Sequence, residues 1–303
     1  MAWRYASRPL DWPSLFGRQA PLEVELGFGD GAFLVRSAAE RPEANLVGLE
    51  THWKRCQQAL DRARRAGVTN CRVLHADGRL ALERLFAPRS IRSFVALFPT
   101  PWRKTRDAAE RFFSRATLVL LNNRLEPDGI VRVVTDDRDY AAWVLANVPE
   151  GFVAEARDVG PGLDTYFERR WQREGIRAFT EIALKKSAHL DAAVLEDLPV
   201  RTYVVPTFDA NHFAPVEEHG STTIVFHEFV YDPLRNRALQ HAIIVDEGFK
   251  QDAWITIARE PGGWRIHPVR QASTVPTPGL QRALDLVREA VERGTASSRR
   301  PGP

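Results

Sequence analysis

Short apolar runs alternate with amphipathic segments along the first two thirds of the chain. Strands buried on both faces of a parallel sheet are continuously apolar, and the helices that join them show an apolar stripe. The expected strands are 22–26, 45–49, 71–75, 93–98 and 130–134, and the expected helices are 31–41, 53–66, 107–123 and 137–147. Five such units in series predict an α/β fold with a doubly wound, Rossmann-like sheet. A last strand over 179–184 is expected to pair antiparallel with 152–157.

The pattern changes near residue 189, where strand-like sequence replaces the alternation. The expected elements are strands 203–205, 222–229, 242–245, 254–258 and 264–268 and a helix over 280–292. Trp254 and Trp264 flank a predicted hairpin at Pro261-Gly262-Gly263 and are expected to anchor a core. We therefore predict two domains: 1–189, and a smaller α+β domain, 190–303, with a packed C-terminal helix and a frayed tail.

Composition places the chain among ordinary globular proteins. Hydrophobic residues make up 44% and charged residues 27% of the 303 positions. No stretch approaches the roughly 18 apolar residues of a membrane span, and the first ten residues lack the apolar core of a signal peptide. Only Cys56 and Cys71 are present, and the spacing of the five histidines after residue 190 matches no metal site. We expect a cytoplasmic protein without membrane or metal.

The net charge of +3 is divided unevenly between the two predicted domains. Residues 1–189 carry 30 Lys and Arg against 24 Asp and Glu, whereas residues 190–303 carry 12 against 15. The basic first part is compatible with a polyanionic partner, although arginine-rich solvated faces are common. The acidic second part is a poor RNA clamp. It is expected to be an accessory domain that shapes the substrate site or mediates self-association.

The junction between the first strand and the first helix reads V-E-L-G-F-G-D-G. Gly27, Gly29 and Gly31 lie where small residues let the backbone approach a ligand beside the N-terminus of a helix. A nucleotide-like ligand is therefore expected. The same letters satisfy the dinucleotide fingerprint, with Glu50 near the position of the ribose-binding acid, so an NAD-dependent enzyme is one hypothesis.

Three acidic residues favour S-adenosylmethionine as the ligand. Glu25, two residues before the first glycine, suits the ammonium of a methionyl group but would repel a pyrophosphate. Glu50 follows the second strand and can bind both ribose hydroxyls. Asp77 follows the third strand and offers an acceptor to the adenine amino group. The favoured hypothesis is a methyltransferase; a redox enzyme and a non-catalytic domain of the same shape are the alternatives.

At the fourth strand the chain reads F-P-T-P-W-R-K-T-R, from Phe98 to Arg106, and here it resembles the bacterial tRNA (guanine-N7)-methyltransferases. That family has F-P-D-P-W followed by K-x-R-H and further basic residues. The likeness spans about residues 11–186 and includes D-W-P-S-L-F-G, P-L-E-V-E-L-G-F-G, V-G-L-E, T-D-D-x-x-Y and T-x-F-E. The resemblance implies a doubly wound methyltransferase fold that uses S-adenosylmethionine to methylate N7 of a guanosine in the variable loop of tRNA.

The resemblance also implies roles for individual residues. Glu25, Gly27, Gly29, Glu50 and Asp77 would hold the cofactor. The residues that would contact the tRNA substrate are Lys104, Arg106, Asp136, Thr165 and Glu168, with Arg111 also part of the basic segment. A structural alternative exists for several of them, because Asp136 and Thr165 can cap helices or turns and Lys104 can be a solvated charge. Trp102 is expected to be a pocket wall rather than a stacking platform.

Two positions depart from the family pattern. Thr100 stands at the position of the family's catalytic aspartate, and Asp107 replaces the histidine after K-x-R, followed by Ala108, Ala109 and Glu110. Methylation of N7 needs alignment rather than an obligatory base, because that nitrogen already carries a lone pair. Thr100 can still offer one neutral hydrogen bond in place of a carboxylate. The alternatives are a catalytically silent relative that binds RNA or protein, and a methyltransferase with another target.

Overall fold

The computed structural model describes residues 7–163, 165–175, 178–192, 199–246, 249–269 and 274–298. The chain falls into two compact units, Met1–Leu195 and Glu196–Pro303. In the first unit the strands are β1 (Leu22–Leu26), β2 (Asn45–Glu50), β3 (Cys71–His75), β4 (Ile91–Leu97), β5 (Leu125–Thr135), β6 (Phe152–Val159) and β7 (Phe179–Lys186). Its helices are α1 (Trp12–Phe16), α2 (Ala32–Glu40), α3 (Trp53–Ala66), α4 (Gly78–Arg84), the 3-10 turn η2 (Thr105–Glu110), α5 (Arg115–Arg124), α6 (Arg138–Ala146) and α7 (Tyr166–Arg173).

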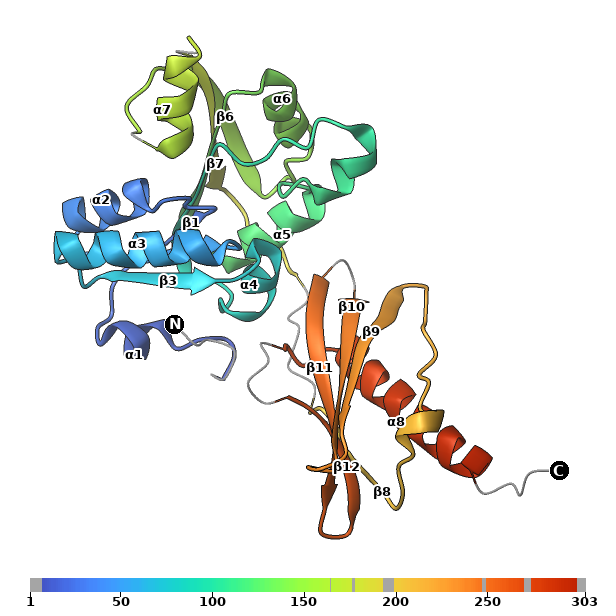
Figure 1. Ribbon diagram of the computed structural model, residues 1–303. Coiled ribbons are helices and arrows are strands. Elements are labelled where there is room, and N and C mark those ends of the chain that lie inside the picture. The colour runs from blue at the N-terminus through green and yellow to red at the C-terminus, as the bar shows by residue number, and fades with distance from the viewer. Residues whose placement is uncertain are drawn as a thin grey trace. The chain divides into compact units, whose positions relative to one another are not determined.

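The sheet of the first unit has the order β3-β2-β1-β4-β5-β7-β6. The neighbours from β3 to β5 pair in parallel, whereas β7 runs antiparallel to both β5 and β6. Figure 1 shows α2 and α3 on one side of these strands and α5 and α6 on the other. This is the predicted doubly wound α/β fold, and it brings the carboxyl ends of β1, β2, β3 and β4 to one edge, where ligands of such sheets bind.

The apolar runs predicted the strands of this sheet closely, and the predicted helices were right except in one place. The segment expected as a single helix over 107–123 is instead η2 followed by α5. The break is made by Ser114, whose hydroxyl accepts from the backbone N–H of Thr117 and so caps a new helix. The short helices α4 and α7 were not predicted. They begin at Asp77 and Thr165, whose side chains accept hydrogen bonds from the N–H groups of their first turns.

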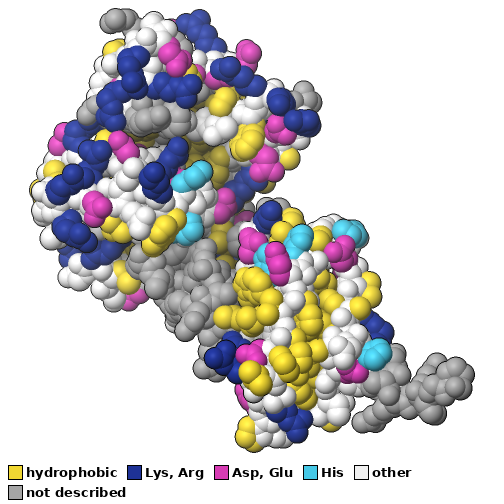
Figure 2. Space-filling model, viewed as in Figure 1, with side chains coloured by type: hydrophobic (Ala, Val, Ile, Leu, Met, Phe, Trp, Pro, Cys, Tyr) yellow, Lys and Arg dark blue, Asp and Glu magenta, His cyan; other side chains and the backbone are white. Residues whose placement is uncertain are grey.

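The second unit is a five-stranded antiparallel sheet with one long helix, as expected. Its elements are β8 (Tyr203–Val205), η3 (Ala210–His212), β9 (Thr222–Asp232), β10 (Arg237–Asp246), β11 (Phe249–Glu260), β12 (Gly263–Pro268) and α8 (Pro278–Ser298), and the strand order is β8-β12-β11-β10-β9. One face of the sheet packs on α8 (Figure 1), through residues such as Ile244, Ile255 and Leu284. Apolar side chains also lie on the face shown in Figure 2.

Of the two tryptophans expected in this core, Trp264 is in it and Trp254 is not. Trp264 is buried against the α8 side. Trp254 pairs across the strands with His241 on the opposite face and stacks on its ring at a centroid distance of 4.8 Å. Both tryptophans fit a strand, and alternation alone does not say which set of side chains a helix will cover.

A buried lysine joins the last strand of the first unit to the end of α5. The ammonium of Lys186 donates to the carbonyl oxygens of Asn122 and Leu125, both at 2.7 Å, and lies 3.1 Å from Nδ1 of His189. Burial lowers the pKa of Lys186. Its neighbour Lys185 points to the other face, where its side chain is largely exposed beside Asp128.

Lys186→Met is expected to lower the free energy of unfolding of the first unit by about 1–3 kcal/mol, because two buried carbonyls lose their donor. Lys185→Met is the matched control and should change it by less than about 0.5 kcal/mol. Denaturant unfolding followed by circular dichroism measures both. Equal effects of the two substitutions would contradict the structural role given to Lys186.

Candidate functional site

The loop after β1 combines two open glycines with one that is closely packed. Gly27 and Gly29 have φ angles of 65° and 58°, and a Cβ added to either would meet no atom within 4 Å. Gly31 has φ 74°, and its added Cβ would lie 2.5 Å from Cβ of Ala59. Gly31 therefore lets α2 approach α3, whereas Gly27 and Gly29 keep free space beside the loop. That space is what a ligand bound by backbone N–H groups requires.

Glu25 lies at the carboxyl end of β1, just before this loop. Its side chain is 5% exposed, and its Oε2 has no hydrogen-bond partner. Burial, together with the negative charge of Asp30, raises the pKa of Glu25 to about 8. A buried carboxyl oxygen without a partner is costly, so this position favours a ligand that brings a positive charge or a donor.

Glu50, at the end of β2, is equally buried but fully engaged. Its Oε1 accepts from the backbone N–H groups of Thr51 at 2.9 Å and His52 at 3.0 Å, and its Oε2 accepts from the N–H of Gly29 at 3.2 Å. Burial alone would raise the pKa of Glu50, but the hydrogen bonds from His52 and the charge of Arg55 outweigh it and lower that pKa. Glu50 is therefore an ionised carboxylate that fixes the glycine loop.

Asp77 follows β3, so the three acids come from three strands that are neighbours in the sheet. Asp77 is exposed, and its Oδ1 accepts from the N–H groups of Arg79 at 2.9 Å and Leu80 at 3.1 Å. This carboxylate caps α4 in the structure. Its position at the same sheet edge is the one expected for an adenine contact.

Asp30 in the glycine loop is the junction of two arginines. Its Oδ2 lies 3.2 Å from Arg62 of α3 and 3.1 Å from Arg169 of α7. The sequence analysis did not single out Asp30, although it stands within the G-x-G-D-G segment. This pair of ion pairs ties α7 to the loop between β1 and α2.

The T-x-F-E segment stabilises the start of α7 through hydrogen bonds of its own side chains. Thr165 Oγ1 accepts from the N–H of Glu168 at 3.0 Å, and Glu168 is buried, with its Oε1 accepting from the N–H groups of Gly162 and Leu163 at 2.7 and 3.0 Å. The carbonyl of Leu163 in turn accepts from Arg36 of α2. Thr165 and Glu168 were expected to contact the substrate. In the structure both form hydrogen bonds that fix the start of α7 and the segment before it.

A hollow of about 460 Å³ lies beside the F-P-T-P-W segment. Thr100, Lys104 and Asp136 line it, together with Trp102 and Trp171. Phe98 and Trp102 hold φ angles of 56° and 44°, a left-handed conformation that bulky residues seldom adopt. Burial raises the pKa of Asp136. The structure brings Thr100, the predicted catalytic-position residue, together with Lys104 and Asp136 of the predicted substrate residues.

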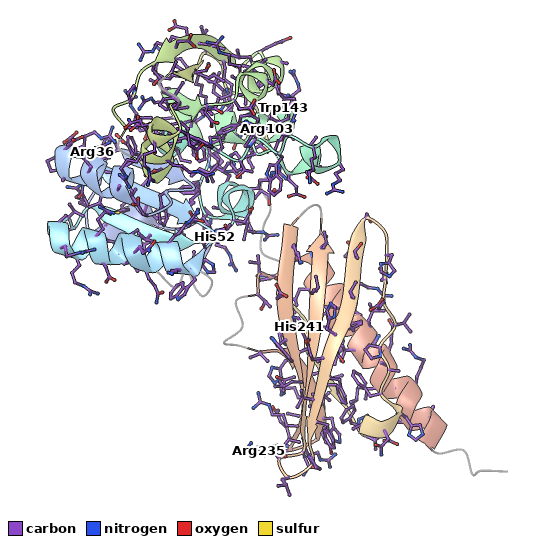
Figure 3. All side chains as sticks on the ribbon, turned by 45° about the horizontal axis from the view of Figure 1, so that its top comes forward. Arg36, His52, Arg103, Trp143, Arg235 and His241 are labelled. Carbon is purple, nitrogen blue, oxygen red and sulfur yellow. The ribbon has the colours of Figure 1, made fainter. Side chains whose placement is uncertain are left out.

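A second hollow of about 490 Å³ shares Pro101, Arg103 and Asp136 with the first. Arg103, labelled in Figure 3, binds Asp137 with its Nε 2.7 Å from Oδ2. Arg111 donates to the carbonyls of Pro101 at 3.0 Å and Trp102 at 3.2 Å, which fixes the left-handed loop. Arg111 is therefore a support of this loop in addition to its predicted place in the basic segment.

Three predicted substrate residues are not among the residues that line either hollow, namely Thr165, Glu168 and Arg106. Arg106 is the exposed one of the three. Its side chain is 76% exposed and lies 3.5 Å from Asp107. Trp171 and Arg103 line the hollow but were missed by the sequence analysis. Trp171 follows the T-x-F-E segment by three positions, and that spacing was the available signal.

Neither a membrane helix nor a metal cluster was found among the residues that the structure describes. No helix of these segments is long and apolar enough to cross a bilayer. Within the same segments, no group of three or more His, Cys, Asp or Glu side chains is arranged to hold a metal ion.

Comparison with known proteins identifies relatives of the first unit. The family described as "Putative methyltransferase" matches residues 19–180. The tRNA (guanine-N(7)-)-methyltransferase of Chlorobium phaeobacteroides is 37% identical over 171 residues, which cover 56% of this chain and 84% of that protein. The enzyme of the same name from Thermotoga maritima is 36% identical and is covered over 58% of its length. Among solved structures, the 16S rRNA methyltransferase KamB aligns with a TM-score of 0.46 at 17% identity, over 58% of this chain and 93% of that one.

The match to the putative methyltransferases extends over more than half of the chain, and the match to the Chlorobium protein extends over most of that relative. The chain therefore belongs to the methyltransferase family that includes the tRNA (guanine-N(7)-)-methyltransferases.

Proposed function

We propose that this protein transfers a methyl group from S-adenosylmethionine to N7 of a guanosine in the variable loop of tRNA. The observation that carries the proposal is the unpartnered, buried Oε2 of Glu25 at the edge of the open glycine loop. The hollow of about 460 Å³ beside Thr100 supports the proposal, because a base could lie there. The names of the relatives support tRNA as the substrate and guanine N7 as the target.

The residues at the sheet edge fit this methyl donor. Glu25 would hold its ammonium group, Glu50 its ribose hydroxyls and Asp77 its adenine amino group, while Gly27 and Gly29 leave room for it beside the backbone. When bound, S-adenosylmethionine supplies a methyl group on sulfur: a C–N bond forms to N7 as the C–S bond breaks, which leaves a neutral thioether and a positive charge on the purine. No proton must move in that step.

The substrate side of the site would act by positioning. Thr100 can donate to or accept from the guanine with its hydroxyl, and Asp136 can accept from the base or a ribose. Lys104 is exposed at the rim of the hollow and can bind a phosphate. Rate enhancement would come from alignment of N7 with the methyl group.

The purified protein should transfer label from methyl-labelled S-adenosylmethionine to guanine N7 of tRNA that lacks this modification. The initial rate at subsaturating tRNA should fall as salt rises, because contacts between Lys or Arg and phosphates release counterions. Digestion of the RNA and chromatography of the nucleosides identifies the position. Label on another base or on another macromolecule would contradict the proposal.

The affinity for S-adenosylmethionine should rise with pH up to about 8 and fall above it, where the α-amino group of the ligand loses its own proton. The pKa of Glu25 is about 8 in the free protein. A cationic ligand lowers that pKa, so binding below pH 8 must release the proton, which costs up to about tenfold in affinity for each unit of lower pH. Calorimetric titration across this range measures the slope.

Glu25→Gln removes the titrating group and should flatten the pH dependence below pH 8 while weakening binding. Glu40→Gln, at a largely exposed position of α2, is the matched control and should keep the slope of the unmodified protein. If Glu25→Gln and the unmodified protein share one slope, Glu25 does not face the ammonium group.

Thr100→Asp should raise kcat/KM for tRNA by about tenfold. A carboxylate can accept from the guanine N1–H and amino groups and can offset the positive charge on the ring, which at about 4 Å is worth on the order of 1–4 kcal/mol. Thr100→Asn, whose amide offers one uncharged acceptor oxygen, is the matched control and should give a smaller gain. Transfer by Thr100→Asp together with none by the unmodified protein would favour the catalytically silent relative.

A further inference from the structure

Two indoles line the hollow in which the base would lie. Trp102 follows β4 and is 40% exposed, and Trp171 comes from α7. Trp171 packs against the buried cluster that contains Phe98 and Val134 and is itself half-buried. Its Nε1 is buried without a hydrogen-bond partner, so the indole is held there by its apolar contacts and not by its polar atom.

The indole of Trp171 already faces a cation. The guanidinium carbon of Arg170 lies 5.1 Å from the centre of the ring, and Arg170 lines the same hollow. A positive group within about 6 Å of an indole face is attracted by the ring quadrupole, and tryptophan is the strongest of the aromatic residues in this respect. The hollow thus contains π surface that accepts positive charge.

The hollow is lined by two acidic residues, Asp107 and Asp136, and neither offers a free negative charge. Asp107 lies 3.5 Å from Arg106, and burial raises the pKa of Asp136. Three basic residues, Arg103, Lys104 and Arg170, line the same space. Thr100 adds no charge. A purine that becomes positive here therefore meets no surplus of carboxylate.

We propose that Trp171, with Trp102, selects a positively charged purine by its π surface, and that it takes over the charge stabilisation which a carboxylate at position 100 would provide. The ligand class is an N7-alkylated guanine nucleotide, the form in which the ring carries a full positive charge. The inference rests on the proposed function, because methylation at N7 creates this charge. Trp171 is accordingly a specificity-determining residue of the methyl-transfer site.

The test uses nucleotide binding, which is independent of methyl transfer. Calorimetric titration at mildly acidic pH with 7-methylguanosine 5′-monophosphate and with guanosine 5′-monophosphate should show tighter binding of the methylated nucleotide. Trp171→Leu should reduce the affinity for the methylated nucleotide by about tenfold and that for the unmethylated one by less than about threefold. Trp171→Phe keeps a weaker π face, so its affinity for the methylated nucleotide should lie between that of Trp171→Leu and that of the unmodified protein.

Trp53→Leu is the matched control, because Trp53 is 58% exposed at the start of α3 and is not among the residues that line the hollow. It should leave both affinities unchanged. Should Trp171→Leu fail to fold, as judged by its thermal unfolding, the exposed Trp102→Leu provides the same comparison. Equal loss for the two nucleotides, no preference in the unmodified protein, or no binding of the methylated nucleotide would each overturn the inference.

These outcomes separate this inference from the proposed function. Methyl transfer to tRNA without any preference for the methylated nucleotide would overturn the role of Trp171 alone. A preference that depends on Trp171 in a protein that methylates no tRNA would leave the indole site standing and overturn the proposed function.

Discussion

The carboxyl group of Glu25 is the constraint around which the first unit is organised. Three acidic side chains, those of Glu25, Asp30 and Glu50, lie near the end of β1. Asp30 and Glu50 are paired with other groups of the protein. Asp30 binds Arg62 and Arg169, and Glu50 accepts from backbone N–H groups and lies 3.5 Å from Arg55. Glu25 alone keeps a buried oxygen without a partner. A protein can sustain such a group where a ligand supplies the missing partner, since strain and unsatisfied polar groups concentrate at functional sites.

The ion pair between Asp30 and Arg169 also links the glycine loop to α7. Arg169 on α7 reaches Asp30, and Glu168, one position earlier, holds the backbone of Gly162 and Leu163. The helix that carries Trp171 to the hollow beside Thr100 is therefore the helix that is bound to the glycine loop. Under the proposed function, this connection would hold the cofactor side and the substrate side in the alignment that an in-line transfer requires.

The sequence predicted the fold well because the strands and helices of the first unit are indicated by residues within each segment and at its two ends. The run Leu22–Leu26 is bounded by Pro21 and Gly27, and α3 by an acidic strand end and Gly67, so both were predicted with their observed bounds. The helix over 107–123 was predicted too long, because a hydroxyl cap at Ser114 competes with a continuous helical pattern. The face of Trp254 was missed because burial of a strand face depends on where α8 packs.

The sequence predicted which residues lie at the site but not which of them form hydrogen bonds within the protein. Glu25, Glu50 and Asp77 lie on the predicted sheet edge, and Thr100, Lys104 and Asp136 line one hollow. Whether a carboxylate faces a ligand or an N–H group of its own chain is set by tertiary contacts. The capping by Asp77 and the buried bonds of Glu168 were therefore beyond the reach of the motif.

The distribution of arginines bears on how the protein could hold a polyanion despite its diluted basic segment. The arginines Arg103, Arg138 and Arg157 have side chains that are more than 70% exposed although each lies beside a carboxylate. Of these three pairs, that of Arg138 and Asp158 alone is exposed on both sides, so Arg138 can exchange its carboxylate for a phosphate at small cost. The side chains of Asp137 and Glu181 are largely buried, and loss of their arginines would leave a buried charge without that partner. Under the proposed function, Arg138 would add a phosphate contact outside residues 107–110. The indoles and Thr100 carry no charge and would leave the choice of base to shape and π surface.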